Sequence, residues 1–297
     1  DGSSLCPGNV DGFRLMIGPT RPPAWDWSWQ NTLAAKLGLP APIALVPCWE
    51  GSGQLREVVG GSTLTLQGTA TWSGSSGGGG LRCDANGEGA NITAPDYVKI
   101  AWPISVMWVG QFVALTGSTN PTMFGVSYDT AGAAPPYFGY YLYHNSSGSL
   151  GLALGYNKGD ANFPFLTSGI TPVVGQRVCA VGTMKSGSQK LYIDGVLKAT
   201  GTQTGSPIYA SDALLFIGDQ PLARNSATVS EGGVIWNCEL TPPQAQLISA
   251  LPFAYHTRAS NLALRYIQSG HPALRRLGLL GPAFRPVEIG REGVRIF

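Results

Sequence analysis

The sequence contains little charge and no long hydrophobic run. Only 12% of its 297 residues are charged, and no stretch approaches the roughly 20 apolar residues that a membrane helix needs. It also lacks a G-x-y period, which excludes collagen. Hydrophobic residues make up 43% of the chain, enough for a packed core, which excludes global disorder. With 41 Gly and 22 Pro, the chain has too many turn formers for a helix-dominated protein, so the composition predicts a turn-rich β protein.

The small net charge is unevenly distributed. A total of +2 argues against a nucleic-acid partner. Residues 251–297 hold seven Arg, no Lys and two Glu, a net +5, which leaves −3 for residues 1–250. The same stretch is rich in apolar residues, so we expect it to be an attachment tail that contacts a neighbouring subunit or carrier. The alternative is that it folds back on its own domain. The residues expected to make the attachment are Arg275, Arg276, Leu279, Leu280, Phe284 and Phe297.

Cysteine is scarce and widely spaced. The five Cys form no C-x-x-C pair, so a zinc site is not expected. Their odd number leaves at least one thiol free or paired between chains. The first residue is Asp1, so we expect either a cleaved N-terminal segment or a trimmed chain.

Between residues 42 and 250 the sequence reads as short strands separated by Gly-rich turns. A hairpin is expected over 190–199, because Asp194-Gly195 between two alternating runs is typical of a type I′ turn. About a dozen such strands predict two packed antiparallel sheets. The expected strands are 43–49, 63–67, 80–83, 89–93, 104–114, 123–128, 137–143, 150–156, 177–184, 214–218 and 233–238.

Helices are expected at three places. The strongest signal is a capping box, Thr241-x-x-Gln244, with two Pro in the first turn, which predicts a helix over 241–250. A short helix is expected over 29–37 and another over 260–268. Strand pieces are expected at 287–289 and 293–297. The three Trp within 25–29 could stack a ligand, but packing against the following domain is the favoured interpretation.

Six blocks in one order carry a family resemblance. They are Trp49-Glu50-Gly51-Ser52-Gly53, 64–72 with Gly80-Leu81-Arg82-Cys83, 104–109, 191–195, 216–218, and 233–236 before the Thr241 helix. With these blocks, residues 42–250 resemble the laminin-G-like, concanavalin A-like jelly-roll domains. The resemblance implies an all-β fold: a two-sheet antiparallel jelly-roll sandwich with short helices. Residues 1–41 are then an N-terminal extension, and 251–297 the basic, apolar attachment tail.

Catalytic residues are not expected. Glycosidases of this fold resemble one another in an E-x-D-x-E or E-x-D-x-x-E strand, because retaining hydrolysis needs two carboxyls about 5–5.5 Å apart. The sequence contains no E-x-D, and its three His lie beside no nucleophile motif. The Gly77–Gly80 run has no Lys-Ser/Thr after it, so it is no phosphate loop.

Ligand sites remain open. Many laminin-G-like domains hold calcium at the sheet rim, so calcium is a candidate cofactor, with Asp129, Asp160 and Asp219 in expected loops. Solvated turn Asp residues are the alternative. Sugar binding would use rim aromatics and amides. The candidates for sugar contact are Tyr137, Tyr140, Tyr156 and Asn157.

These observations predict a non-enzymatic structural or binding protein displayed on a surface. The leading hypothesis is a phage virion protein, a capsid decoration or minor structural component, because the flanks are similar, more loosely, to extensions that attach phage structural proteins. The alternatives are a secreted carbohydrate-binding module and a cell-surface adhesin or filament subunit. The expected partners are capsid or like subunits and cell-surface glycans, without nucleic acid or a membrane span. The expected location is the virion or the extracellular space.

Overall fold

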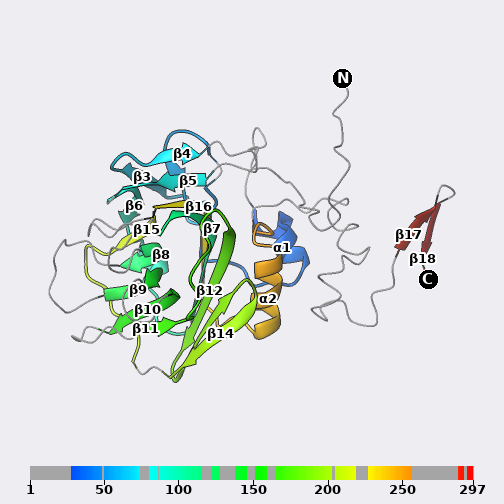
Figure 1. Ribbon diagram of the computed structural model, residues 1–297. Coiled ribbons are helices and arrows are strands. Elements are labelled where there is room, and N and C mark those ends of the chain that lie inside the picture. The colour runs from blue at the N-terminus through cyan, green and yellow to red at the C-terminus, as the bar shows by residue number, and fades with distance from the viewer. Residues whose placement is uncertain are drawn as a thin grey trace.

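Two antiparallel sheets, stacked face to face, form the body of this computed structural model (Figure 1). The structure describes residues 28–48, 50–73, 80–85, 87–115, 122–127, 138–145, 151–158, 165–202, 205–218, 227–255, 287–290 and 293–296. Sheet A contains β1 Ala44–Val46, β4 Thr71–Ser73, β5 Gly80–Cys83, β7 Ile104–Ala114, β12 Arg177–Lys185, β13 Ser188–Ile193, β14 Val196–Gly201 and β16 Ala227–Trp236. Sheet B contains β2 Leu55–Arg56, β3 Thr63–Gln67, β6 Gly89–Thr93, β8 Thr122–Ser127, β9 Phe138–Asn145, β10 Gly151–Lys158, β11 Phe165–Thr167 and β15 Leu214–Gly218. The predicted jelly-roll sandwich is confirmed.

Side-chain alternation divides sheet A between two cores. In β7, Val106 and Trp108 point into the core between the sheets, while Met107 and Val109 belong to a second core on the other face. The helices η1 Trp29–Asn31, α1 Leu33–Lys36 and α2 Pro242–Ala250 lie on that outer face (Figure 1). Sheet A is therefore buried on both sides, which explains why its central strand is apolar at nearly every position.

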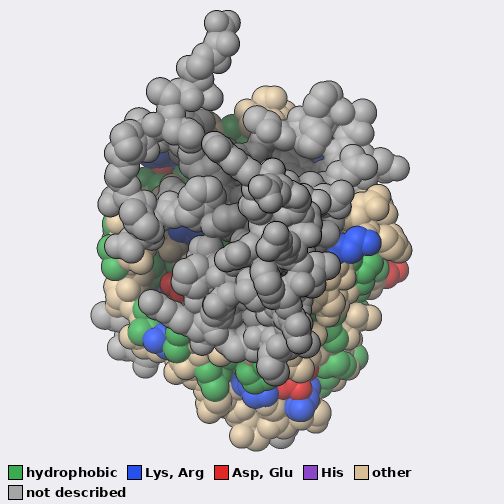
Figure 2. Space-filling model, turned by 90° about the vertical axis from the view of Figure 1, so that its right-hand side faces the viewer, with side chains coloured by type: hydrophobic (Ala, Val, Ile, Leu, Met, Phe, Trp, Pro, Cys, Tyr) green, Lys and Arg blue, Asp and Glu red, His purple; other side chains and the backbone are tan. Residues whose placement is uncertain are grey.

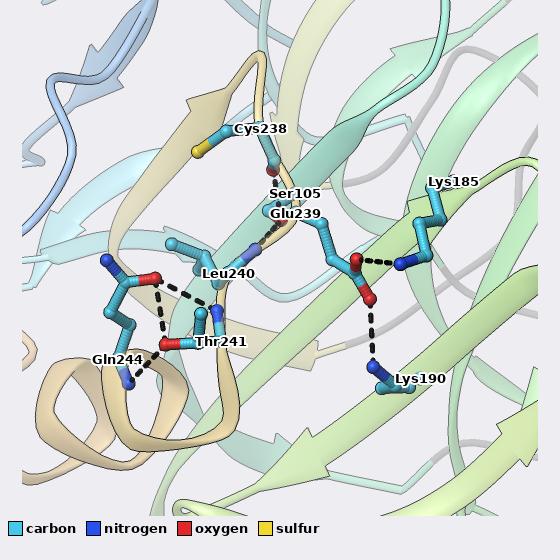
Figure 3. A network of polar contacts seen from close by, with 8 residues as sticks. All are labelled: Ser105, Lys185, Lys190, Cys238, Glu239, Leu240, Thr241 and Gln244. Carbon is cyan, nitrogen blue, oxygen red and sulfur yellow. Dashed lines mark hydrogen bonds and ion pairs between the residues drawn. The ribbon is translucent and has the colours of Figure 1, made fainter.

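A polar network fixes α2 against sheet A (Figure 3). Thr241 and Gln244 form the predicted capping box. Just before it, the Ser105 hydroxyl of β7 donates to the Cys238 carbonyl at 2.7 Å and accepts from the Leu240 amide at 3.1 Å. The helix thus begins at a position that is bonded to the middle of the sheet. None of the described helices is long and apolar enough to cross a membrane.

Tyr255, which follows α2, contacts the segment that precedes β1. Its ring stacks on Trp29 with centroids 5.6 Å apart, and its hydroxyl accepts from Trp236 Nε1 and donates to the Pro40 carbonyl. The Ala34 amide donates to the Ala254 carbonyl at 3.0 Å. Packing of Trp29 is therefore confirmed, whereas Trp25 and Trp27 lie outside the described residues.

Local turn signals in the sequence are also confirmed. Asp194 and Gly195, between β13 and β14, both have positive φ, 49° and 79°, as a type I′ turn requires. The expected strands at the C-terminus form a hairpin, β17 Val287–Gly290 with β18 Gly293–Ile296. The helix expected over 260–268 lies outside the described residues.

β16 differs most from the sequence prediction, because it begins at Ala227 rather than at 233. Its first half carries polar side chains that are mostly buried. Ser230 and Glu231 have partners on neighbouring strands, whereas the Thr228 hydroxyl has no hydrogen-bond partner among the described residues. The Ser230 hydroxyl accepts from Trp108 Nε1 at 2.9 Å, and Glu231 forms a 2.6 Å ion pair with Arg177 of β12. A register shift between Ser230 and Gly232 interrupts the ladder, which hides the strand period in the sequence.

Glu57 is a fully buried carboxylate between the sheets' ends. Its Oε1 accepts from the amides of Leu45 in β1 at 2.9 Å and Val59 at 2.7 Å. Its Oε2 accepts from the Gly60 amide at 2.7 Å and from the Tyr97 hydroxyl at 2.8 Å; Tyr97 lies in the 3₁₀ helix η2 Asp96–Val98. One carboxylate therefore connects sheet A to the segment that follows β6 of sheet B.

Replacing Glu57 by Gln should destabilise the fold. Gln would place an NH₂ group, which is a hydrogen-bond donor, next to groups that are also donors, and at least one buried N–H would lose its acceptor. We therefore expect a loss of about 3 kcal/mol in the free energy of unfolding. Urea denaturation measures this loss. The control is Asp96→Asn, since Asp96 is fully exposed and should change stability little. Equal stability of E57Q and wild type would contradict the role of Glu57.

His144 of β9 is buried against Phe112 of β7, with ring centroids 5.5 Å apart. Its Nε2 has no hydrogen-bond partner among the described residues. Burial lowers the pKa of His144 below its usual value of 6.5, because the charged imidazolium would lose its water.

Stability should therefore fall as the pH drops through about 6.5, the pKa of His in the unfolded chain. Below that pH the unfolded state binds a proton that the folded state does not, at a cost of at most about 1.4 kcal/mol per pH unit. Denaturation at pH 7.5, 6.5 and 5.5 tests this. H144F should have a shallower pH slope than wild type in this window, whatever its absolute stability. Parallel slopes would show that His144 does not cause the loss.

Candidate ligand-binding face

The outer face of sheet B is the side of the sandwich on which no described helix lies (Figure 1). Sheet A is covered by α1 and α2, so its outer face is occupied. On sheet B, the residues that alternate with the core positions form two neighbouring groups, one aromatic and one polar.

The aromatic group lies over β8, β9 and β15. Tyr141, Tyr143 and Phe216 form a cluster of their own, separate from both cores. Tyr141 contacts Tyr143 and Phe216 edge-on, with centroids 5.7 and 6.2 Å apart. Phe165 of the edge strand β11 contacts Tyr143 and is 47% exposed, while the other three rings are buried. We call these four residues the aromatic cluster.

The polar group lies on β3 and β6, beside Phe216. Cα pairing places Thr65 next to Asn91 and Asn91 next to Phe216. Gln67 Nε2 donates to Asn91 Oδ1 at 3.3 Å, and Thr65 and Thr93 are exposed. We call Thr65, Gln67, Asn91 and Thr93 the polar ledge. Hydroxyl and amide groups can both donate and accept hydrogen bonds, so the ledge fits an uncharged polar ligand.

Two glycines let the strands under the aromatic cluster approach closely. A Cβ on Gly125 of β8 would lie 2.3 Å from the Tyr140 carbonyl oxygen and 2.6 Å from the Tyr141 Cα. A Cβ on Gly139 of β9, where φ is 92°, would lie 2.0 Å from the Val126 carbonyl oxygen. The position of Tyr141 therefore depends on Gly at both sites.

The acidic residues near the sheets serve structural bonds. Burial alone would raise the pKa of Glu88, but hydrogen bonds from the Thr69 hydroxyl and the Ala85 and Asp84 amides outweigh it and lower that pKa. Burial would likewise raise the pKa of Glu239, but its bonds to Lys185 and Lys190, at 2.7 and 2.8 Å, lower it (Figure 3).

Buried thiols are unsuited to nucleophilic chemistry. Cys48 and Cys179 are fully buried. Burial raises the pKa of Cys48 well above its usual value and that of Cys179 to about 12, so neither forms a thiolate at neutral pH.

Tyr140 does not lie at the rim, contrary to the sequence interpretation. Its side chain is fully buried in the core, and its hydroxyl donates to the Val98 carbonyl at 3.0 Å. Tyr156 and Asn157 lie in β10, paired with Tyr140 and Gly139. Tyr137 lies outside the described residues, as do the expected calcium ligands Asp129, Asp160 and Asp219. No group of three potential metal ligands occurs among the residues that are described.

The attachment residues of the tail also lie outside the described part of the chain; they are Arg275, Arg276, Leu279, Leu280, Phe284 and Phe297. The residues of the ledge and Tyr141 and Tyr143 were not selected from the sequence. Alternation could have found the polar ledge, since Thr63, Thr65 and Gln67 alternate with Leu64 and Leu66.

The fold is a β-sandwich of two antiparallel sheets, and part of the chain matches a family model. Residues 106–246, which run from β7 into α2, match the family model described as the concanavalin A-like lectin/glucanases superfamily. This match confirms the resemblance inferred from the sequence blocks. Among curated proteins, none matches the chain.

Solved structures share the fold at low sequence identity. Domain 4 of AbnA, a GH43 extracellular arabinanase from Geobacillus stearothermophilus, in complex with arabinotriose, is 20% identical with a TM-score of 0.55, over 70% of this chain and 98% of that domain. Trypanosoma rangeli sialidase in complex with sialic acid is 12% identical with a TM-score of 0.53; the match covers 71% of this chain but only 33% of the sialidase. The binding domain of botulinum neurotoxin serotype G is 11% identical with a TM-score of 0.53, over 71% of this chain and 51% of that one.

Substitution of Gly125 by Ala should disrupt the aromatic cluster. The new methyl group meets backbone rather than a movable side chain, so we expect a loss of at least about 3 kcal/mol. Gly187→Ala is the control, because Gly187 also has positive φ but nothing within 4 Å of its Cβ, so its loss should stay near 1 kcal/mol. Denaturation and near-ultraviolet circular dichroism of the Tyr signals measure both effects. Similar losses for the two variants would contradict the close approach.

Proposed function

We propose that this protein is a non-enzymatic, surface-displayed binding protein that holds a glycan on the outer face of sheet B. The observation that carries the proposal is the polar ledge, an uncharged row of hydroxyl and amide groups beside an aromatic cluster. Sugars present hydroxyls that donate and accept hydrogen bonds, which match the ledge, and C–H faces that can pack on an exposed ring such as Phe165.

Two structural relatives support a sugar ligand. The arabinanase domain was solved with arabinotriose and the sialidase with sialic acid. Their identity to this chain is low, so they support the ligand class by analogy of fold. The ledge itself favours a neutral sugar.

The absence of catalysis is part of the proposal. Hydrolysis by this fold needs two carboxyls set for acid and nucleophile roles. Glu57, Glu88 and Glu239 are each engaged by several donors, and Glu231 is paired with Arg177. The hydrogen bonds to Glu88 and Glu239 lower the pKa of both carboxyls, which makes these two residues poor proton donors at neutral pH.

We propose further that residues 251–297 attach the sandwich to an assembly, with a phage virion as the leading candidate. The tail carries a net charge of +5 and residues 1–250 carry −3. This opposite charge favours contact between the tail of one copy and the remainder of another copy. Trp29 and Tyr255, near the two ends of the described sandwich, are in contact on the helix side, which faces the viewer in Figure 2; the outer face of sheet B lies on the opposite side. The alternatives are a secreted carbohydrate-binding module and a cell-surface adhesin.

A glycan array with wild type and a Thr65→Ala/Asn91→Ala double variant tests the ligand. We expect binding of a neutral oligosaccharide by wild type and a loss of tenfold or more in the double variant, because two hydrogen bonds of about 1 kcal/mol each are removed. The control is Thr200→Ala, on exposed β14 at the far side of sheet A. Unchanged affinity in the double variant would exclude the ledge, and hydrolysis of the sugar by the wild-type protein would overturn the non-enzymatic assignment.

A further inference from the structure

The C-terminal hairpin β17–β18 forms a sheet of its own. Its four residue pairs run from Val287 with Ile296 to Gly290 with Gly293, and it belongs to neither of the two large sheets. Figure 1 shows it clear of the sandwich, beyond the helix side. A two-stranded sheet alone is marginally stable in water. The hairpin therefore gains stability from a further strand.

No strand of the described part of the chain pairs with the outer edge of β14 in sheet A. β14 is the last strand of its sheet, and it is longer than the other end strands, β4, β11 and β2. Val196 and Leu197 on it are 53% and 45% exposed. Proteins usually protect an edge with charges or cover it. Lys198 is the one charged residue of β14 and is the extra residue at a bulge, so the apolar pair before it is unprotected.

The chain between the sandwich and the hairpin is long enough to reach another molecule. Tyr255 contacts the sandwich, and residues 256–286 connect it to β17. At about 3.3 Å per extended residue, those residues can span distances larger than the sandwich itself. The hairpin is not paired with its own β14. The basic tail is also attracted by the negative remainder of a second copy.

We propose that the β17–β18 hairpin of one copy adds to the β14 edge of a second copy. This inference rests on the attachment role proposed above and names both the partner and the surface. Because each copy gives a hairpin and receives one, the contact joins two different surfaces and produces a dimer by reciprocal exchange, a larger ring or a chain.

Light scattering coupled to size-exclusion chromatography tests the proposal on the full chain and on two variants. One variant lacks residues 287–297, and the other carries Val196→Lys and Leu197→Lys. We expect wild type to be oligomeric and each variant to be monomeric. The matched control carries Val173→Lys and Val174→Lys, two adjacent exposed Val away from the edge, 62% and 51% exposed, and should assemble as wild type does.

An equimolar mixture of the two variants is the decisive measurement. One variant still has a hairpin and the other still has an edge, so the mixture should give a 1:1 dimer and nothing larger. A monomeric wild type, an oligomer that survives the deletion, or a mixture without heterodimer would each overturn the inference. If wild type is monomeric and the deletion lowers its melting temperature, the hairpin folds onto its own chain instead.

Glycan binding by the same variants separates this inference from the ligand proposal. The ledge lies on sheet B, so both variants should keep the affinity of wild type. A wild-type protein that binds the glycan but does not assemble would overturn the hairpin contact alone. Assembly without glycan binding would overturn the ligand and leave the contact in place.

Discussion

The bonds to Glu57 are the constraint on which the arrangement of the two sheets depends. A buried carboxylate is costly unless donors surround it, and here four donors come from three separate segments. Burial, and the neighbouring carboxylate, also raise the pKa of Tyr97 to about 12, so its hydroxyl remains a donor at any physiological pH. The segments that Glu57 joins lead into β3 and out of β6, the two strands of the polar ledge. The geometry of the candidate face therefore depends on a charge that lies inside the molecule.

Local signals in the sequence predict the elements well, and long-range pairing explains what they miss. The type I′ turn at Asp194 and the capping box at Thr241 depend on neighbours in sequence, so both are predictable. In β9, however, Tyr140, Tyr141, Leu142 and Tyr143 are all apolar, so alternation cannot say which of them face the core. The pairing of β9 within sheet B determines the orientation: Tyr140 faces inward, and Tyr141 lies on the outer face. The polar, bulged half of β16 is stabilised by distant partners, which no local pattern reveals.

The candidate face also explains how one fold can carry different ligands. The inner core and the helix-side core use almost every position of sheet A, so substitutions there are constrained by packing. On sheet B, the outward positions of β3 and β6 are not part of any core and can change without loss of the sandwich. The side chains on these strands can therefore vary while the fold persists, and the similar structures share the fold at 11–20% identity to this chain.

The meeting of both flanks at Tyr255 has a mechanical consequence. Tension applied between the N-terminal and C-terminal arms would act on two segments that lie side by side, rather than across the sandwich. The Trp29 stack and the single Ala34–Ala254 backbone bond would bear that load first and would separate one after another. The two large sheets do not lie between the two segments under tension, so they would stay folded. An assembly could thus be stretched through its two ends while the outer face of sheet B keeps its shape.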